Sequence, residues 1–252
     1  MALLIIGVTE DGAAAFSTPL DHGADPETVV FDQGYTALRP LSAEWCGADL
    51  GLRLLVRPQV GQPRPDPLPP RTDAGLIISD DVVPVTRQRV AAYAVVLSAK
   101  GLLATEYSAT TAVQGRWGMP GGGLDDHEPP VDCVRREVHE ETAQQIVLGE
   151  LTEVQTGHWI GRNPGGMIED FHAVRLVYRA TCPEPTEPVV LDRGGSTASA
   201  RWVGLDFWTR LPWTANWMMV LTGLLPDPKV SAEVVAAATP PADNSQQREA
   251  TP

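Results

Sequence analysis

The sequence predicts an α/β (α+β) fold, an α/β/α sandwich with a mixed sheet, preceded by a small β-rich N-terminal region. Three observations lead to this prediction. Apolar runs of strand length alternate with two helical patterns across the centre of the chain. A proline-rich stretch separates this central block from a shorter block of strand-like runs. The chain has 252 residues, 43% of them hydrophobic, which is enough to bury a substantial core.

The N-terminal block, residues 1–57, is predicted to be a small β-rich accessory region used for packing or for forming a homodimer. Strand-like runs at 3–8, 28–31 and 52–56 are separated by Gly, Asp and Pro. The following residues 58–73 contain six prolines and few apolar side chains. This composition excludes a helix or an inner strand and predicts a semi-extended linker.

The central block, residues 74–225, carries the alternating pattern. A hairpin is predicted from 90–98 and 101–107, turning at Lys100 and Gly101. The remaining predicted elements, in order, are a helix at 130–142, strands at 146–155, 171–180 and 200–203, and a helix at 214–224. The tail, residues 226–252, is small, polar and punctuated by proline, which predicts disorder.

The overall charge limits the partners of the protein. The formal net charge is −13, so electrostatics oppose binding to long nucleic acid or to an anionic membrane surface. No apolar run is long enough to span a membrane. Three widely spaced cysteines without a C-x-x-C pair argue against a disulfide framework or a zinc site, and favour the reducing cytoplasm.

A dense acidic cluster follows three consecutive glycines. Seven of the seventeen residues from Asp125 to Glu141 are acidic, and Glu137, Glu140 and Glu141 share one face of the predicted helix. Three carboxylates within one turn repel one another unless a cation lies between them, and oxygen ligands at this density suit Mg²⁺ or Mn²⁺. The alternative is a solvated acidic helix. Glycines at 121–123 favour the metal, because backbone without side chains approaches an ion or phosphate closely.

This pattern resembles the Nudix box, G-x5-E-x7-R-E-U-x-E-E-x-G-U, where U is a bulky aliphatic residue. We call residues 122–144 the box. The matching residues are Gly122, Glu128, Arg136, Glu137, Val138, Glu140 and Glu141, with Trp117, Pro120 and Gly121 in the approach to it. Two positions depart from the pattern: Ala143 replaces a helix-ending glycine, and Gln144 replaces an aliphatic residue. Without that glycine, the helix is predicted to run on through Gln145.

The resemblance covers about residues 88–225 and implies that 74–225 form a Nudix hydrolase domain. It implies that Glu137, Glu140 and Glu141, with the carbonyl of Gly121, hold one to three Mg²⁺ or Mn²⁺ ions. The implied reaction is hydrolysis of a nucleoside diphosphate linked to another group. Glu128 and Arg136 would lock the loop against the helix, and Gly122 would let the backbone approach the substrate. Glu140 is our candidate general base, with Glu169 or Asp170 outside the box as alternatives.

The predicted substrate is a small nucleotide, either a nucleoside triphosphate or a nucleotide sugar. Residues 157–166, with four glycines, are predicted to form an exposed, mobile hairpin loop near the far end of the substrate. Trp159 would offer a π-face for a base, and Arg162 a contact to phosphate or ribose oxygens. The alternative is that Trp159 caps the core and Arg162 is a solvated tip. The alternative function is a non-catalytic Nudix-fold module that senses a nucleotide or ADP-ribose.

Overall fold

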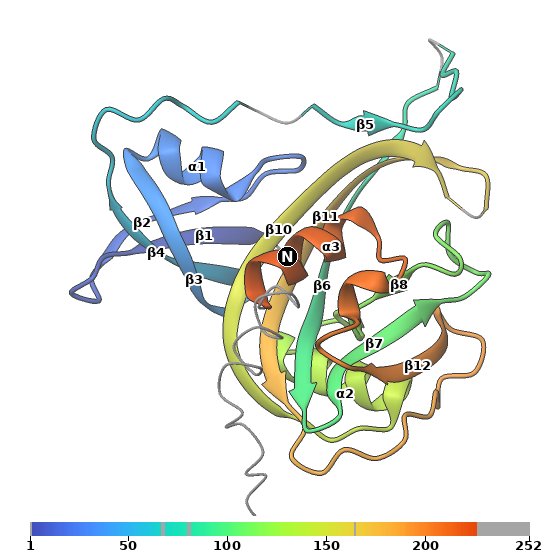
Figure 1. The fold of residues 1–252 in the computed structure, drawn as a ribbon. Coiled ribbons are helices and arrows are strands. Elements are labelled where there is room, and N and C mark those ends of the chain that lie inside the picture. The colour runs from blue at the N-terminus through green and yellow to red at the C-terminus, as the bar shows by residue number, and fades with distance from the viewer. Residues whose placement is uncertain (1, 67–68, 80–81, 164, 226–252) are drawn as a thin grey trace, which may run out of the picture.

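The computed structural model describes residues 2–66, 69–79, 82–163 and 165–225. These residues form a four-stranded sheet, a larger eight-stranded mixed sheet and three α-helices (Figure 1). The mixed α+β fold expected from the sequence is therefore confirmed. The predicted disordered tail, 226–252, lies outside the described residues. No helix within the described part of the chain is long and apolar enough to cross a membrane.

The N-terminal block contains the four-stranded sheet, in the order β2-β1-β4-β3. Its elements are β1 (Leu3–Val8), β2 (Ala14–Pro19), α1 (Pro26–Asp32), β3 (Tyr35–Cys46) and β4 (Asp49–Pro58). The strand predicted at 28–31 is wrong, because these residues lie in α1. The carboxylate of Asp25 accepts the backbone N–H of Thr28 and Pro26 occupies the first turn, so local capping outweighs the strand preference of the β-branched run.

The larger sheet has the order β12-β7-β6-β11-β10-β5, with β8 paired to β7 and β9 paired to β6. Its strands are β5 (Arg71–Thr72), β6 (Val85–Ser98), β7 (Gly101–Tyr107), β8 (Trp117–Gly118), β9 (Gly121–Gly123), β10 (Val147–Arg162), β11 (Ile168–Thr181) and β12 (Thr197–Val203). Two helices, α2 (Pro130–Thr142) and α3 (Ala215–Leu224), and the short 3₁₀ helix Trp208–Arg210 complete the domain. The predicted hairpin, both helices and the three later strands are confirmed.

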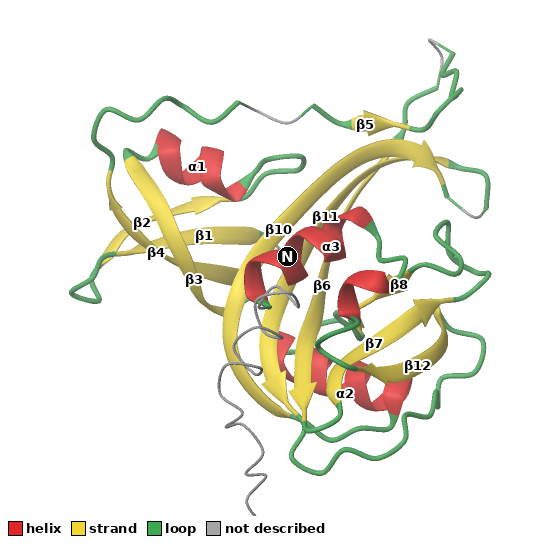
Figure 2. Cartoon of the chain, in the orientation of Figure 1, coloured by secondary structure: helices red, strands yellow, loops and turns green. Residues whose placement is uncertain are grey.

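The two faces of this sheet carry different helices. One face packs on α2, where Ala92 and Leu176 share a buried cluster with Val134. The opposite face packs on α3, where Val95 and Val177 share a second cluster with buried tryptophans. In Figure 2, α3 crosses in front of the curved strands. The alternating side chains of β6 and β11 thus fill two cores, one on each face.

The N-terminal block joins the first of these cores. Leu3, Ile5, Leu50 and Leu52 are buried in the same continuous cluster as Val134 of α2. The proline-rich segment also has fixed contacts, since Arg64 forms a two-pronged ion pair with Asp32 at 2.8 Å from each of two nitrogens. The block and the sheet domain are therefore packed as one body, with β10 curving between them (Figure 1).

The end of α2 corrects one prediction. The helix stops at Thr142, and Ala143 adopts a left-handed conformation at φ 57°, so the helix does not run on through Gln145. The side chain of Gln144 is buried, where its amide donates to the Thr142 carbonyl and to Thr186 Oγ1. The chain thus makes the usual left-handed helix end without glycine, and hydrogen bonds at Gln144 hold it.

Residues 157–166 correct another prediction. β10 continues to Arg162 and pairs with β11 up to the pair Arg162 and Ile168, so residues 157–162 are strand and not loop. Of the predicted loop, the described residues outside the two strands are 163, 165 and 166. The glycines at 157 and 161 are paired within the ladder opposite Ala173 and Glu169. Pairing with a neighbouring strand outweighs the loop preference of glycine.

Candidate active site

The glycine strand β9 lies directly against the acidic helix. A Cβ atom on Gly122 would fall 2.4 Å from Oε1 of Glu137, which leaves no space for any side chain. A Cβ on the next residue, Gly123, would fall 2.1 Å from a guanidinium nitrogen of Arg89. Successive residues of a strand face opposite sides. Bare backbone therefore separates a carboxylate of α2 on one side from an arginine of β6 on the other.

Arg136 organises the carboxylates of the box. Its Nε and Nη2 each donate to Glu128 at 2.8 Å, and its Nη1 donates to Glu137 at 2.9 Å and to Glu140 at 3.1 Å. The hydrogen bonds from Arg136 lower the pKa of Glu128 to about 2. The same pairing with Glu128 raises the pKa of Arg136. One guanidinium thus ties the loop before the helix to two acids on the helix.

Glu141 is the most enclosed acid of the box, at 5% exposure. One carboxylate oxygen accepts the backbone N–H of Gly121 at 3.0 Å, and the other accepts the hydroxyl of Thr197 on β12. Burial raises the pKa of Glu141 to about 7, against the opposing effect of these two hydrogen bonds. Burial also raises the pKa of Glu137. These acids are held in an environment that penalises negative charge.

The donor set fits a hard divalent cation. Glu137, Glu140 and Glu141 carry carboxylates at neighbouring positions of α2, and the carboxylate of Glu137 occupies the space that a side chain on residue 122 would need. Among the described residues the three carboxylates do not form a preassembled ligand cluster, so they would turn towards a bound ion. Burial makes the negative charge of Glu137 and Glu141 less favourable, which raises their pKa values. A cation bound between these groups would offset that cost. Such oxygen-rich sets suit Mg²⁺ or Mn²⁺. Cys133, which is fully buried beneath the glycines, donates its S–H to the Gly122 carbonyl, and burial raises its pKa to about 12.

Two arginines that carry no signal in the sequence lie beside the box, on the face of the sheet that also packs against α3. The guanidinium of Arg89 lies against Gly123. Ala91 of β6 pairs with Gly123 on one side and with Arg175 on the other, so Arg175 lies two strands away from Gly123 in the same row of the sheet. Neither forms an ion pair with any residue that the structure describes. In the sequence, Arg175 lies between two apolar residues of a predicted strand and Arg89 lies just before the predicted strand 90–98, so no pattern singles out either residue. Their closeness to the box depends on long-range strand register, which the sequence does not reveal.

Trp159 lies on the same face as these arginines. Its ring stacks on Phe171 with centroids 4.6 Å apart. A Cβ on Gly157 would fall 3.5 Å from Nη1 of Arg175 and 3.6 Å from the ring of Trp159, so both side chains border this glycine. Trp159 and Arg175 therefore form a neighbouring aromatic and cationic pair.

The other predicted residues outside the box lie elsewhere. The guanidinium of Arg162 donates to the Gly166 carbonyl at 2.9 Å, at the exposed tip of the hairpin. Glu169 and Asp170 are strand residues of β11 and not loop acids. Asp170 pairs with Thr86 of β6, and Gly123 of the box pairs with Ala91 of the same strand. These two positions are five residues apart, which corresponds to roughly 16 Å along the strand. In the part of the chain that the structure describes, neither acid forms a hydrogen bond or ion pair with a box residue, so the geometry does not favour either as the general base.

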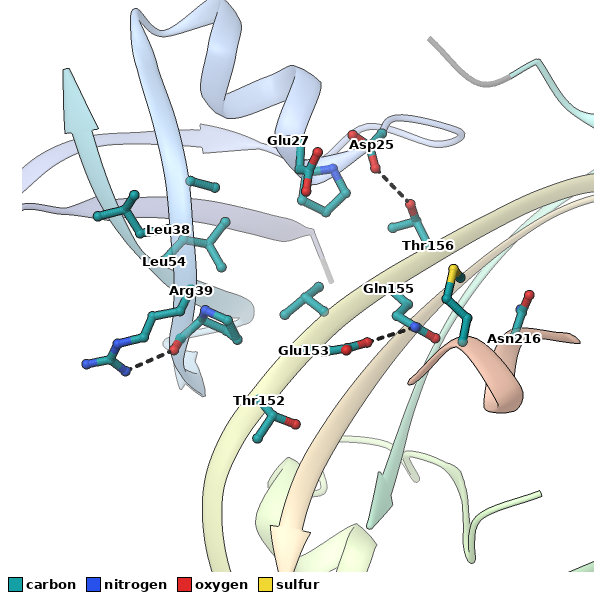
Figure 3. A pocket seen from close by; sticks show the side chains of 15 residues that line it. Asp25, Glu27, Leu38, Arg39, Leu54, Thr152, Glu153, Gln155, Thr156 and Asn216 are labelled. Carbon is teal, nitrogen blue, oxygen red and sulfur yellow. Dashed lines mark hydrogen bonds between the residues drawn. The ribbon is translucent and has the colours of Figure 1, made fainter. Parts of the chain in front are cut away.

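A cavity of about 510 Å³ opens where the N-terminal block, β10 and α3 meet (Figure 3). Asp25, Glu27 and Arg39 come from the N-terminal block, and Asn216 comes from α3. The lining on β10 includes a hydrogen-bonded pair, in which Gln155 donates to Glu153 at 2.8 Å. Gln155 is also the direct cross-strand partner of Arg175. The cavity therefore adjoins the surface that carries Arg175 and Trp159.

The N-terminal block also touches the loop of the box. The indole N–H of Trp45 on β3 donates to the backbone carbonyl of Glu128 at 3.0 Å. The Trp45 ring lies against His127, with centroids 5.2 Å apart. The loop whose glutamate pairs with Arg136 is thus braced from outside the sheet domain.

A comparison with protein-family models agrees with these features. A protein-family model described as the NUDIX domain matches residues 87–217. A search among curated proteins finds no match. Among solved structures, a MutT NUDIX hydrolase from Burkholderia pseudomallei is 24% identical, with 54% of this chain and 97% of that chain covered at a TM-score of 0.37. The NUDIX domain of Shewanella oneidensis NrtR, solved with ADP ribose, is 19% identical, with 59% and 89% covered at a TM-score of 0.40.

Proposed function

The chain belongs to the NUDIX domain family, and from this membership we propose that it is a metal-dependent pyrophosphohydrolase. Its substrate is a small nucleoside diphosphate-linked compound, a nucleoside triphosphate or a nucleotide sugar, and its metal is Mg²⁺ or Mn²⁺. The observation that carries this proposal is the hydrogen-bond network around Arg136 in the box. Arg136 holds Glu128, Glu137 and Glu140 together, while Glu137 fills the space above Gly122.

The metal-binding groups in this proposal are the carboxylates of Glu137, Glu140 and Glu141, with the carbonyl of Gly121. A bound Mg²⁺ would supply charge neutralisation at the phosphate oxygens and an activated water. The distribution of charge in the chain supports this role. A pyrophosphate is anionic, so an acidic site binds it only when a cation reverses the local sign.

The chain's own residues supply the rest of the chemistry. Glu140 is our proposed general base, because its side chain is 42% exposed and is oriented by Arg136. It would take the proton of the attacking water as oxygen adds to phosphorus and the anhydride P–O bond breaks. Arg89 and Arg175, free of ion pairs to any described residue, would bind the phosphate oxygens that leave.

The remainder of the substrate would lie along β10. Trp159 offers a ring for stacking, and the adjoining cavity of about 510 Å³ is large enough for a nucleoside or a sugar. Its lining acids, Asp25, Glu27 and Glu153, disfavour a phosphate there and suit hydroxyl or amino groups that donate hydrogen bonds. The proposed substrate is therefore oriented with its phosphates at the box and its uncharged part in the cavity.

The test is phosphate and nucleoside monophosphate release from a panel of nucleoside triphosphates, nucleotide sugars and ADP-ribose, with Mg²⁺, Mn²⁺ or a chelator. We expect turnover of at least one compound, with activity lost in the chelator. Tight binding of ADP-ribose or a nucleotide with no turnover in either metal would instead support the non-catalytic sensing module. Turnover that survives complete removal of metal would contradict the role given to the box.

A further inference from the structure

A second cluster of metal-ligand side chains lies away from the box, where the N-terminal block meets the long strands. His22 belongs to the connection between β2 and α1, His158 to β10 and Asp170 to β11. One ligand atom from each of these three residues lies within 4.8 Å of the other two. The cluster therefore joins three separate parts of the chain at one point.

The geometry of the cluster is convergent. Nε2 of His22 lies 2.9 Å from Oδ1 of Asp170, and Nε2 of His158 lies 2.5 Å from the same oxygen. In a tetrahedral zinc site with bonds of about 2.0–2.1 Å, neighbouring ligand atoms are about 3.3 Å apart. Shifts of less than about 1 Å would thus open both contacts enough for an ion to bind all three atoms.

The surroundings hold these side chains in place. The His158 ring packs on Gly23, where a Cβ would fall 2.7 Å from the ring. A third imidazole, His172, is fully buried with its ring centroid 5.6 Å from that of His22. Nδ1 of His172 pairs with Nε2 of Gln88 at 2.9 Å, which ties this imidazole to β6. A third histidine side chain therefore packs beside the cluster and restricts its movement.

The chemistry of the cluster differs from that of the box. Two imidazoles and one carboxylate favour a transition ion such as Zn²⁺, whereas Mg²⁺ prefers oxygen ligands alone. His22, His158 and Asp170 keep side-chain exposures of 24%, 18% and 27%, so solvent can supply a fourth ligand. We propose that His22, His158 and Asp170 form a binding site for a divalent transition-metal ion of the Zn²⁺ type, which fastens the N-terminal block to the sheet domain.

The cysteine pattern of the sequence argues against a zinc site and does not predict this cluster. Its ligands are histidines and an aspartate from distant positions, brought together by the register of β10 and β11 and by the packing of the N-terminal block. From the sequence, Asp170 is an alternative general base and not a metal ligand. Its carboxylate accepts hydrogen bonds from both histidines, which is the position expected of a shared ligand.

The test uses the full-length protein, stripped with a chelator and then given Zn²⁺ in a large excess of Mg²⁺, which occupies the box. After gel filtration, metal analysis should find one Zn²⁺ per chain, and Zn²⁺ should raise the thermal midpoint. Asp170→Asn and His158→Gln keep side chains able to form hydrogen bonds but are poor ligands. Each should weaken Zn²⁺ binding at least ~100-fold, more than typical losses outside the ligand shell.

Two controls separate this site from others. His139→Ala removes an exposed histidine on α2 and should leave Zn²⁺ binding unchanged. The double variant Glu140→Gln with Glu141→Gln disables the box and should also keep its Zn²⁺. Failure of the wild type to retain Zn²⁺ would overturn the proposal. Equal Zn²⁺ retention by Asp170→Asn would also overturn it. A third contradicting result is that both ligand variants lose thermal stability while Zn²⁺ does not stabilise the wild type, because the junction would then be held by hydrogen bonds alone.

Discussion

At the scale of single residues, the ion pair of Glu128 with Arg136 predicts how stability depends on pH. The folded-state pKa of Glu128 is about 2, below its ordinary value of 4.5, because Arg136 stabilises the charged form. Its stabilisation is therefore present above pH 4.5 and is lost as the pH falls towards 2. At pH 7, Glu128→Gln should cost on the order of 2 kcal/mol in the free energy of unfolding.

Denaturant unfolding of the wild type and Glu128→Gln across pH 7 to 3 measures this effect. The stability difference between them should shrink as the pH falls below about 5, because the wild-type carboxylate becomes protonated in the unfolded state. Asp126→Asn is the matched control, because Asp126 is an exposed acid two residues earlier in the same loop and makes only a loose 3.8 Å contact with His127. A constant difference over this range would refute the assigned pairing.

The arginines outside the box allow a matched pair of substitutions. Arg175 borders Trp159 and is the cross-strand partner of Gln155, which lines the cavity, whereas the guanidinium of Arg162 donates to the Gly166 carbonyl at the hairpin tip. Both changes to alanine remove one positive charge. With the best substrate of the panel, Arg175→Ala should raise KM about 10-fold with a smaller effect on kcat, because it removes a contact made in both ground and transition states. Equal effects of Arg162→Ala would show that recognition reaches the tip instead.

At this scale, the sequence predicts those site residues that lie close together along the chain. The residues of the box could be predicted because they lie within one loop and one helix, where sequence spacing determines which side chains are neighbours. Arg89 and Arg175 were missed because they reach the site only through the pairing of β6, β9 and β11. Glu169 and Asp170 were candidates only through the family resemblance, and their distance from the box likewise depends on the register of β6 and β11.

At the scale of elements, the left-handed residue after α2 gives a stability prediction. Ala143 holds φ at 57°, a conformation that glycine adopts without steric cost. Ala143→Gly should therefore stabilise the protein by roughly 0.5–1 kcal/mol, after allowing for the greater freedom of glycine in the unfolded chain. Thermal unfolding measures the change, and Ala143→Val should destabilise because a β-branched residue strains this conformation further. A destabilised glycine variant would contradict the assigned helix end.

The elements themselves were predicted where a pattern repeats several times. Helix 130–142 has both its proline start and its apolar face in the sequence, and its predicted bounds are those observed. The run at 28–31 was too short for periodicity to decide, and the cap at Asp25 determined the outcome. β10 extends beyond its predicted end at 155 because β11 pairs with it along its whole length, and glycines within it do not stop the ladder.

At the scale of the whole molecule, the continuous core predicts that the N-terminal block is required for folding. Leu3, Ile5 and Leu50 share one buried cluster with residues of α2 and β11, and Trp45 braces the box loop. A chain beginning at Thr72 should expose this cluster and lose cooperative unfolding. Circular dichroism and thermal melts of the truncated and full-length chains test it. A truncated chain with a sharp transition and normal turnover would show that the block is an accessory, as its composition first suggested.

The central claim is that the box carboxylates perform the reaction, and Glu140→Gln tests it most directly. Steady-state turnover in saturating Mg²⁺ is measured for Glu140→Gln and for the control Glu150→Gln. Glu150 is an exposed acid on β10 whose carboxylate makes only a loose 3.9 Å contact with Arg179, so both variants lose one carboxylate. The account predicts that Glu140→Gln lowers kcat by about 10²–10⁴-fold, as expected for removal of a general base, with an unchanged thermal midpoint. Glu150→Gln should retain the wild-type rate. A folded Glu140→Gln protein with near wild-type kcat would contradict the claim.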